Sequence, residues 1–206
     1  MEQQKENNQV KSFKIALIGD TGVGKTSIFL KYHKNTFNGN HITTVSIDFE
    51  VKNVKYNNNN YSIKIFDTAG QERFKSMITP YFHMADGFFV VFDLTNKNSL
   101  NSVSHWIELI NDKKKDSKFI ILGNKDDLEN NKLNDNEIND VLNKIENYNN
   151  KLFYKVSAKE GKNLTEVFNK MLELLDNKNI IEEDNKSFGL KKTGKKQKIS
   201  NNKKCC

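Results

Sequence analysis

The chain has 206 residues and a formal net charge of +7. This length fits one domain with a short appendage, and it is enough to bury a substantial hydrophobic core. The eight lysines from Lys186 onward meet no acidic residue, and subtracting them leaves a net charge of −1 for residues 1–185. A nearly neutral body argues against a nucleic-acid-binding groove, whereas the basic end favours an anionic partner such as a lipid surface.

The two cysteines exclude several classes of protein. Both stand at the end of the chain, as Cys205 and Cys206, so the body has neither a disulfide framework nor a catalytic thiol. A body without cysteines is typical of a protein in a reducing compartment. Residues 1–11 are polar, unlike a secretory signal, and no run approaches the roughly 20 apolar residues of a membrane span.

Short apolar runs alternate with amphipathic segments along the chain. We expect strands at residues 14–18, 45–56, 61–66, 87–94, 119–122 and 152–156, and helices at 25–34, 99–111, 134–146 and 164–175. The second and third strands form a hairpin around the turn-forming residues Asn57–Asn60. This order predicts an α/β fold with a mostly parallel sheet between helices. Beyond Leu175 the chain is polar and rich in lysine, which favours a flexible tail.

A glycine-rich motif follows the first predicted strand. Residues 19–26 read GDTGVGKT and match G-x-x-x-x-G-K-[ST] between a strand and a helix. Glycines let the backbone approach a phosphate, and the N–H groups at a helix N-terminus bind anions. Lys25 places a charge on the β- and γ-phosphates, and the Thr26 hydroxyl ligates Mg²⁺. The motif predicts a nucleoside triphosphate site, but it leaves open ATP or GTP, and hydrolysis, phosphoryl transfer or binding alone.

Three further motifs bear on which nucleotide the site binds and whether it is hydrolysed. In DTAGQE, Asp67 can hold Mg²⁺ through water, Gly70 can donate its N–H to a γ-phosphate, and Gln71 can orient the attacking water. In NKDD, which begins at Asn124, Asp127 can accept two donors from the edge of guanine, a pattern that adenine lacks. The SAK motif at residues 157–159 can offer a backbone N–H to the guanine oxygen. Together these motifs favour guanine over adenine.

In this order, each after a strand, the motifs resemble those of the Ras superfamily of small GTPases, and within it the Rab family, over about residues 12–176. The Rab-like segments are IDF at 47–49, QERF at 71–74, YF at 81–82 and FDLT at 92–95. The resemblance implies a P-loop GTPase fold with a mostly parallel six-stranded sheet and helices on both faces. It divides the chain into an N-terminal extension (1–11), the GTPase domain (12–176) and a flexible basic tail (177–206).

The resemblance also implies roles for individual residues. Nucleotide binding falls to Thr21, Gly22, Val23, Gly24, Lys25, Thr26, Ser27, Phe37, Thr44, Gly70, Asn124, Lys125, Asp127, Ser157, Ala158 and Lys159. The Mg²⁺ ligands are Thr26, Thr44 and Asp67, the catalytic residue is Gln71, and effectors read Ile47, Phe49, Phe66 and Tyr81. The chain departs from the family pattern at Phe66 (usually Trp), at Ser46 (usually Gly), at His41 (usually aromatic) and over residues 81–85. These departures concern the choice of partner, since none removes a nucleotide ligand.

Arg73 is the only arginine in the chain, and the resemblance gives it no catalytic role. GTP hydrolysis is therefore expected to be slow until an activating protein supplies an arginine in trans. The resemblance further implies an exchange factor, a GDP-dissociation inhibitor, an escort protein and effectors as partners of a monomer that binds no nucleic acid. Three alternatives stay open: a nucleotide-locked scaffold with negligible hydrolysis, an ATP-using P-loop enzyme, and Ras-type signalling.

The terminal Cys205-Cys206 pair does not form a C-a-a-X box. It resembles the Rab signal for two geranylgeranyl groups, and the alternatives are unmodified thiols or an incomplete metal site. Two lipid chains beside a basic segment suffice for stable membrane attachment. We therefore expect a regulator of vesicle trafficking on the cytoplasmic face of an intracellular membrane, cycling with the cytosol.

Overall fold

A computed structural model describes residues 10–39, 48–68, 75–115, 117–145 and 152–190, with only the backbone path given for 75–78 and 178–190. The strands are β1 (Lys11–Ile18), β2 (Asp48–Tyr56), β3 (Asn59–Asp67), β4 (Gly87–Asp93), β5 (Lys118–Asn124) and β6 (Phe153–Lys155). The helices are α1 (Lys25–Lys34), α2 (Lys75–Met84), α3 (Lys97–Asn101), α4 (Val103–Lys113), α5 (Asp135–Leu142) and α6 (Leu164–Leu190). The chain divides into one compact unit over residues 1–175 and another over 176–206.

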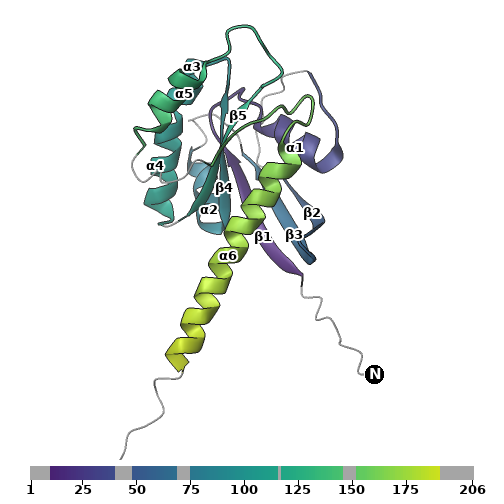
Figure 1. The fold of residues 1–206 in the computed structure, drawn as a ribbon, viewed down its shortest axis with the longest axis vertical. Coiled ribbons are helices and arrows are strands. Elements are labelled where there is room, and N and C mark those ends of the chain that lie inside the picture. The colour runs from purple at the N-terminus through teal and green to yellow at the C-terminus, as the bar shows by residue number, and fades with distance from the viewer. Residues whose placement is uncertain (1–9, 40–47, 69–74, 116, 146–151, 191–206) are drawn as a thin grey trace, which may run out of the picture. The chain divides into compact units, whose positions relative to one another are not determined.

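The six strands form one sheet in the order β2-β3-β1-β4-β5-β6 (Figure 1). All neighbours pair in parallel except β2 and β3, which form the antiparallel hairpin. The fold class expected from the alternation of apolar runs is therefore confirmed. Because parallel strands end at the same edge of the sheet, the loops that follow β1, β3, β5 and β6 are brought together there.

The core consists of two apolar layers, one on each face of the sheet. The first layer packs α1 and α6 against the sheet through residues such as Ile28 and Phe168. The second packs α2, α4 and α5 through residues such as Phe82, Ile110 and Ile138.

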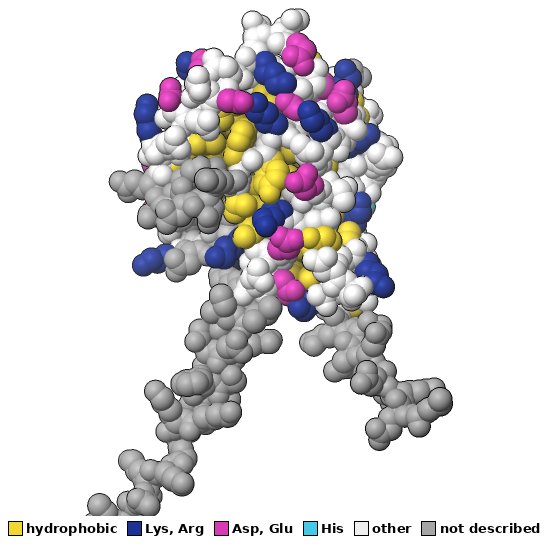
Figure 2. All heavy atoms as spheres, in the orientation of Figure 1, with side chains coloured by type: hydrophobic (Ala, Val, Ile, Leu, Met, Phe, Trp, Pro, Cys, Tyr) yellow, Lys and Arg dark blue, Asp and Glu magenta, His cyan; other side chains and the backbone are white. Residues whose placement is uncertain are grey.

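On the face of the molecule that Figure 2 shows, lysines and acidic side chains are interspersed rather than segregated.

The boundaries of several elements differ from the predicted ones. The hairpin turn has only two residues, Asn57 and Asn58, and both have positive φ (47° and 61°), so β3 already begins at Asn59. This is the conformation of a type I′ turn, which matches the twist of the flanking strands. The predicted helix over 99–111 is wrong as a single element, because the chain forms two helices with Ser102 between them.

Helix α3 begins earlier than predicted because the Asn96 side chain caps it, accepting hydrogen bonds from the backbone N–H groups of Asn98 and Ser99. At the other end of the chain, α6 does not end at Leu175 but continues to Leu190. No proline interrupts this stretch. The flexibility expected of the tail stays a prediction for residues 191–206, which lie outside the described residues.

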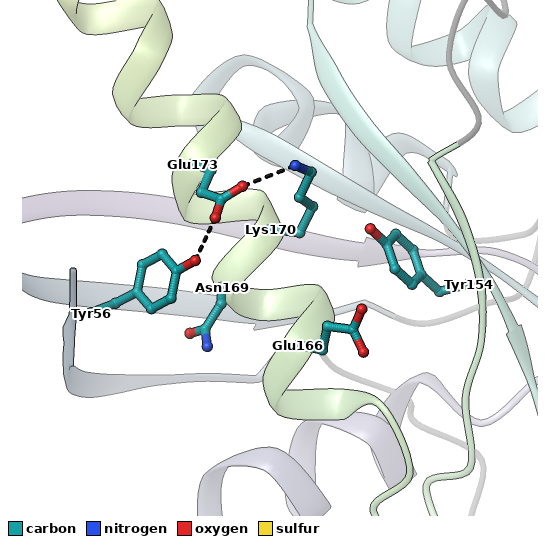
Figure 3. A pocket seen from close by; sticks show the side chains of 6 residues that line it. All are labelled: Tyr56, Tyr154, Glu166, Asn169, Lys170 and Glu173. Carbon is teal, nitrogen blue, oxygen red and sulfur yellow. Dashed lines mark hydrogen bonds and ion pairs between the residues drawn. The ribbon is translucent and has the colours of Figure 1, made fainter.

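A small polar network ties the hairpin to α6 (Figure 3). The Tyr56 hydroxyl donates a hydrogen bond to Glu173, whose other oxygen lies 2.9 Å from the Lys170 ammonium. The network borders a surface hollow of about 500 Å³, lined by Tyr56, Tyr154, Glu166, Asn169, Lys170 and Glu173. None of the helices in the described part of the chain is both long enough and apolar enough to cross a membrane.

Candidate nucleotide-binding site

The phosphate loop connects β1 to α1 and depends on two glycines that admit no side chain. A Cβ on Gly19 would lie 2.1 Å from the Val91 carbonyl oxygen, and one on Gly24 would lie 2.2 Å from Asn124 Nδ2. Gly24 also has a φ of 97°, in the left-handed region that favours glycine, and α1 begins at the next residue. A Cβ on Gly22, by contrast, would meet open space. The loop is thus packed against the sheet on one side and open on the other.

Lys25 lies inside this loop and is only 5% exposed. Its ammonium donates hydrogen bonds to the carbonyl oxygens of Gly19 (2.8 Å) and Asp20 (2.7 Å). Burial lowers the pKa of Lys25 to about 8, although the charges of Asp67 and Asp20 oppose the shift. Among the described residues the hydrogen-bond acceptors of this buried cation are carbonyl oxygens alone, a setting that favours a strong anionic ligand.

Asp67 ends β3 and is the most unusual carboxylate of the site. It is 1% exposed, and none of the described residues donates a hydrogen bond to its Oδ1. Burial raises the pKa of Asp67 to about 6, against a hydrogen bond from Thr26 and the charge of Lys25. An unpartnered carboxylate oxygen beside a hydroxyl fits the all-oxygen ligand set of Mg²⁺. Within the described ranges no cluster of three or more His, Cys, Asp or Glu side chains exists.

Asn124, at the end of β5, joins the phosphate side of the site to the guanine side. Its Nδ2 donates to the Val23 carbonyl oxygen (2.9 Å), and its Oδ1 accepts from the Ala158 N–H (3.1 Å). Asn124 is 1% exposed, so both bonds are shielded from water. Of the backbone N–H groups in the SAK motif, that of Ala158 is therefore engaged within the protein.

The two acids of the NKDD motif have different surroundings. Asp126 forms ion pairs with Lys132 (2.8 Å) and Lys162 (2.5 Å). Burial alone would raise the pKa of Asp126, but the hydrogen bonds from the two lysines hold it below its ordinary value. Asp127 instead accepts a 2.6 Å hydrogen bond from the Ser157 hydroxyl, and its other oxygen lies 3.9 Å from the Lys159 ammonium. Asp126 thus stabilises the fold through its two ion pairs, whereas Asp127 is the acid available to bind the guanine base.

Lys125, between Asn124 and Asp126, has a left-handed backbone (φ 69°) and lies 2.6 Å from the Asp93 carboxylate. This ion pair joins the ends of β4 and β5. Phe37 is 40% exposed. Among the other predicted site residues, Thr44, Ile47, Gly70, Gln71, Cys205 and Cys206 lie outside the described residues.

Trp106 contributes to the site in a way that its sequence position did not indicate. It is 5% exposed and lies with Val103 and Ile110 on the buried face of α4. The indole Nε1 also donates a 2.8 Å hydrogen bond to Asp20, within the phosphate loop. The only signal in the sequence was general: a buried tryptophan needs a partner for its N–H. Trp106 thus anchors the loop from α4.

Three of the predicted effector residues, Phe49, Phe66 and Tyr81, lie on the opposite face of the sheet from α1 and α6, but their exposure differs. Phe49 is 51% exposed, whereas Phe66 is 1% exposed. Their ring centroids are 6.2 Å apart, and the Tyr81 ring meets Phe66 edge-on at 5.0 Å. Phe66 therefore supports Phe49 and Tyr81 from beneath rather than offering its own surface.

Comparison with known proteins gives one consistent answer. The Ras family model matches residues 14–177. Rab-10 of Diplobatis ommata is 33% identical over 196 residues, covering 94% of this chain and 95% of the relative. Rab-3C of Bos taurus is 35% identical over 81% of this chain and 72% of its own length, and Rab-13 of Mesocricetus auratus is 33% identical over 77% of each. The chain therefore belongs to the Ras family, as a Rab small GTPase that binds guanine nucleotide and Mg²⁺.

Proposed function

We propose that this GTPase is a nucleotide-dependent switch in vesicle-mediated transport, attached through geranylgeranyl groups on Cys205 and Cys206 to the cytoplasmic face of an intracellular membrane. The observation that carries the proposal is the double hydrogen bond of Asn124, because it couples the phosphate loop to the guanine-side loop. The trafficking role rests on the Rab relatives. The membrane role rests on the basic segment that precedes the two cysteines.

In the proposed site the phosphates are bound by backbone N–H groups of residues 21–27 and by the Lys25 ammonium. Asp127 accepts the two donors of the guanine edge, and Phe37 lies beside the base. Thr26, Thr44 and Asp67 hold Mg²⁺, which when bound neutralises charge on the reacting phosphoryl group.

The switch proposed here depends on the γ-phosphate. Gln71 orients the attacking water, and the N–H of Gly70 and the hydroxyl of Thr44 hold their loops only while the γ-phosphate is present. Its loss releases residues 37–49 and 68–82 from the ordered state. Partners that read Ile47, Phe49 and Tyr81, with Phe66 supporting the last two from beneath, then distinguish the two states. These partners include an exchange factor, an activating protein, a GDP-dissociation inhibitor with an escort protein, and effectors.

Hydrolysis by the pure protein should be slow. Without an arginine in cis, we expect a single-turnover rate constant on the order of 10⁻⁴ to 10⁻² s⁻¹, since an arginine supplied in trans contributes about 10³- to 10⁵-fold. Phosphate release from protein preloaded with GTP and Mg²⁺ measures this rate, with Gln71→Leu as the variant that lacks the water-positioning group. A rate above about 1 s⁻¹ in the pure protein would contradict the proposal, and so would the absence of stimulation by every activating protein tried.

Membrane attachment should depend on the last two residues. Replacing Cys205 and Cys206 by Ser removes both acceptor thiols, so we expect the variant to fractionate with the cytosol while its affinity for GTP is unchanged. Fractionation of cells that express tagged full-length protein checks the first point, and titration with a fluorescent guanine nucleotide checks the second. Asn202→Gln, which keeps both cysteines and every lysine of the basic segment, is the control. A double Ser variant that stays on membranes would exclude the lipid anchor.

A further inference from the structure

One face of the β2-β3-β1 part of the sheet carries an unneutralised cation among aromatic rings. Cross-strand pairing places Val51 opposite Lys64 and Lys64 opposite Lys14, so these three side chains form one row on one face. Phe49 and Phe66 are paired in the next row of the same face. The opposite face of β2 is occupied by α1 and α6, because Lys52 donates to the Tyr32 carbonyl oxygen and Tyr56 donates to Glu173.

Lys64 is held in place by the rings rather than by an acid. Its ammonium lies 3.7 Å from the centroid of Phe49 and 5.4 Å from that of Phe66. Among the described residues, no carboxylate oxygen lies within 4.0 Å of the ammonium of Lys64 or of Lys14. Glu50 lies between Phe49 and Val51 on β2, but its side chain points to the opposite face of the sheet and pairs with Lys34 at 2.9 Å.

The side chains around this cation are unusually exposed for apolar residues. Phe49 is 51% exposed and Val51 is 50% exposed. A partner that covers them also takes the Lys64 ammonium out of water. Removing the ammonium from water costs desolvation free energy, and the cation–π contact offsets only part of it. A complementary anion on the partner is needed to offset the rest.

From this combination we infer that Phe49, Val51 and Lys64, the Lys64 patch, dock a protein segment that carries a carboxylate flanked by apolar side chains. The inference rests on the proposed function, because it specifies which effectors the aromatic surface of this switch accepts. The apolar area of Phe49 and Val51 favours a protein segment over a lipid headgroup, which would pair with the cation but leave the apolar side chains uncovered.

Selection from a displayed peptide library tests this inference. The bait is the full chain loaded with a non-hydrolysable GTP analogue, offered as wild type and as Lys64→Glu. We expect wild-type binders to be enriched in Asp or Glu beside apolar residues. Lys64→Glu should weaken these binders at least 10-fold, and changing the peptide acid to Lys should restore binding to the variant.

Two further variants keep the result interpretable. Lys64→Gln removes the charge without reversing it, so we expect an intermediate loss. Lys55→Glu changes an exposed lysine on the same face of β2, four residues along the strand from Val51, and should leave binding unchanged. Binders without acidic enrichment, binders equally strong for Lys64→Glu, or no binders at all would overturn the inference.

The remaining outcomes separate this inference from the proposed function. Titration with a fluorescent guanine nucleotide should give equal affinities for wild type and Lys64→Glu, and failure of the wild type to bind would refute the switch itself. Binders that need GTP but ignore Lys64 would refute only the docking chemistry. Vesicles containing phosphatidylserine should not bind unlipidated protein through Lys64, and binding that Lys64→Glu abolishes would reassign the patch to a membrane.

Discussion

Replacing Asp127 with Asn should lower the affinity for GTP by about 10²- to 10⁴-fold. The wild-type carboxylate can accept both donors of the guanine edge, and each charge-assisted hydrogen bond contributes about 1.5–3 kcal/mol. The amide offers one acceptor and sets its N–H₂ group against a guanine donor. Discrimination against ATP should therefore fall as well. Competition of a fluorescent guanine nucleotide by GTP and by ATP, in the presence of Mg²⁺, measures both effects.

Asp126 provides the matched control, since it stands next to Asp127 in the same motif but pairs with Lys132 and Lys162. We expect Asp126→Asn to keep its preference for GTP. It should instead lose about 1–3 kcal/mol of unfolding free energy, because the amide lacks the negative charge and keeps only one of the two oxygens that accept from the lysines. Thermal unfolding with and without nucleotide separates the two effects. The reverse result, a specificity change in Asp126→Asn alone, would mean that the two acids have been assigned the wrong way round.

The sequence predicted the positions of the binding motifs well because each motif is local. When a strand is followed by a motif such as GDTGVGKT or NKDD, the loop that carries the motif lies at the edge of the sheet, independently of the rest of the sequence. In a parallel sheet those edges coincide, so the meeting of Lys25, Asp67 and Asn124 followed from topology. Local turn chemistry was predictable to a lesser degree. The run of asparagines indicates a turn, but it does not reveal that two left-handed residues, Asn57 and Asn58, are enough to form it.

What the sequence could not predict are contacts between residues that are far apart along the chain. The bond between Trp106 and Asp20 spans 86 positions, and that between Asn124 and Val23 spans 101. Periodicity reports which residues are buried, but it does not report which polar atom a buried side chain meets. The burial of Phe66, predicted as part of the effector surface, has the same origin, since it depends on Phe49 and Tyr81 packing over it.

Asp67 leads to the second large effect, a gain of stability from removing a charge. Burial raises the pKa of Asp67 from 3.8 to about 6, so the folded state binds this proton more tightly than the unfolded state does. The ionised carboxylate therefore costs stability, with the full cost present above about pH 6 and none below about pH 4. At 1.36 kcal/mol per unit of pKa, Asp67→Asn should stabilise nucleotide-free protein at pH 7 by on the order of 2–3 kcal/mol.

Urea unfolding of protein stripped of nucleotide and Mg²⁺, at pH 7 and pH 4, tests this expectation. The advantage of Asp67→Asn over wild type should shrink toward zero at pH 4. Asp112→Asn, which changes an exposed acid on α4, should stay within about 0.5 kcal/mol of wild type at both values. Lys25, with its pKa lowered to about 8, contributes the opposite trend at high pH, where wild type gains stability between about pH 8 and 10.5.

The same substitution should act in the opposite direction once the ligands are present. Asn at position 67 is a weaker ligand for Mg²⁺ than a carboxylate, so the increase in GTP affinity that Mg²⁺ confers should fall about 10-fold or more. A group that destabilises the free protein and strengthens ligand binding is typical of a functional site. If Asp67→Asn instead destabilised the free protein at pH 7, then Oδ1 would have a partner within the fold, and Asp67 would be a structural acid rather than a metal ligand.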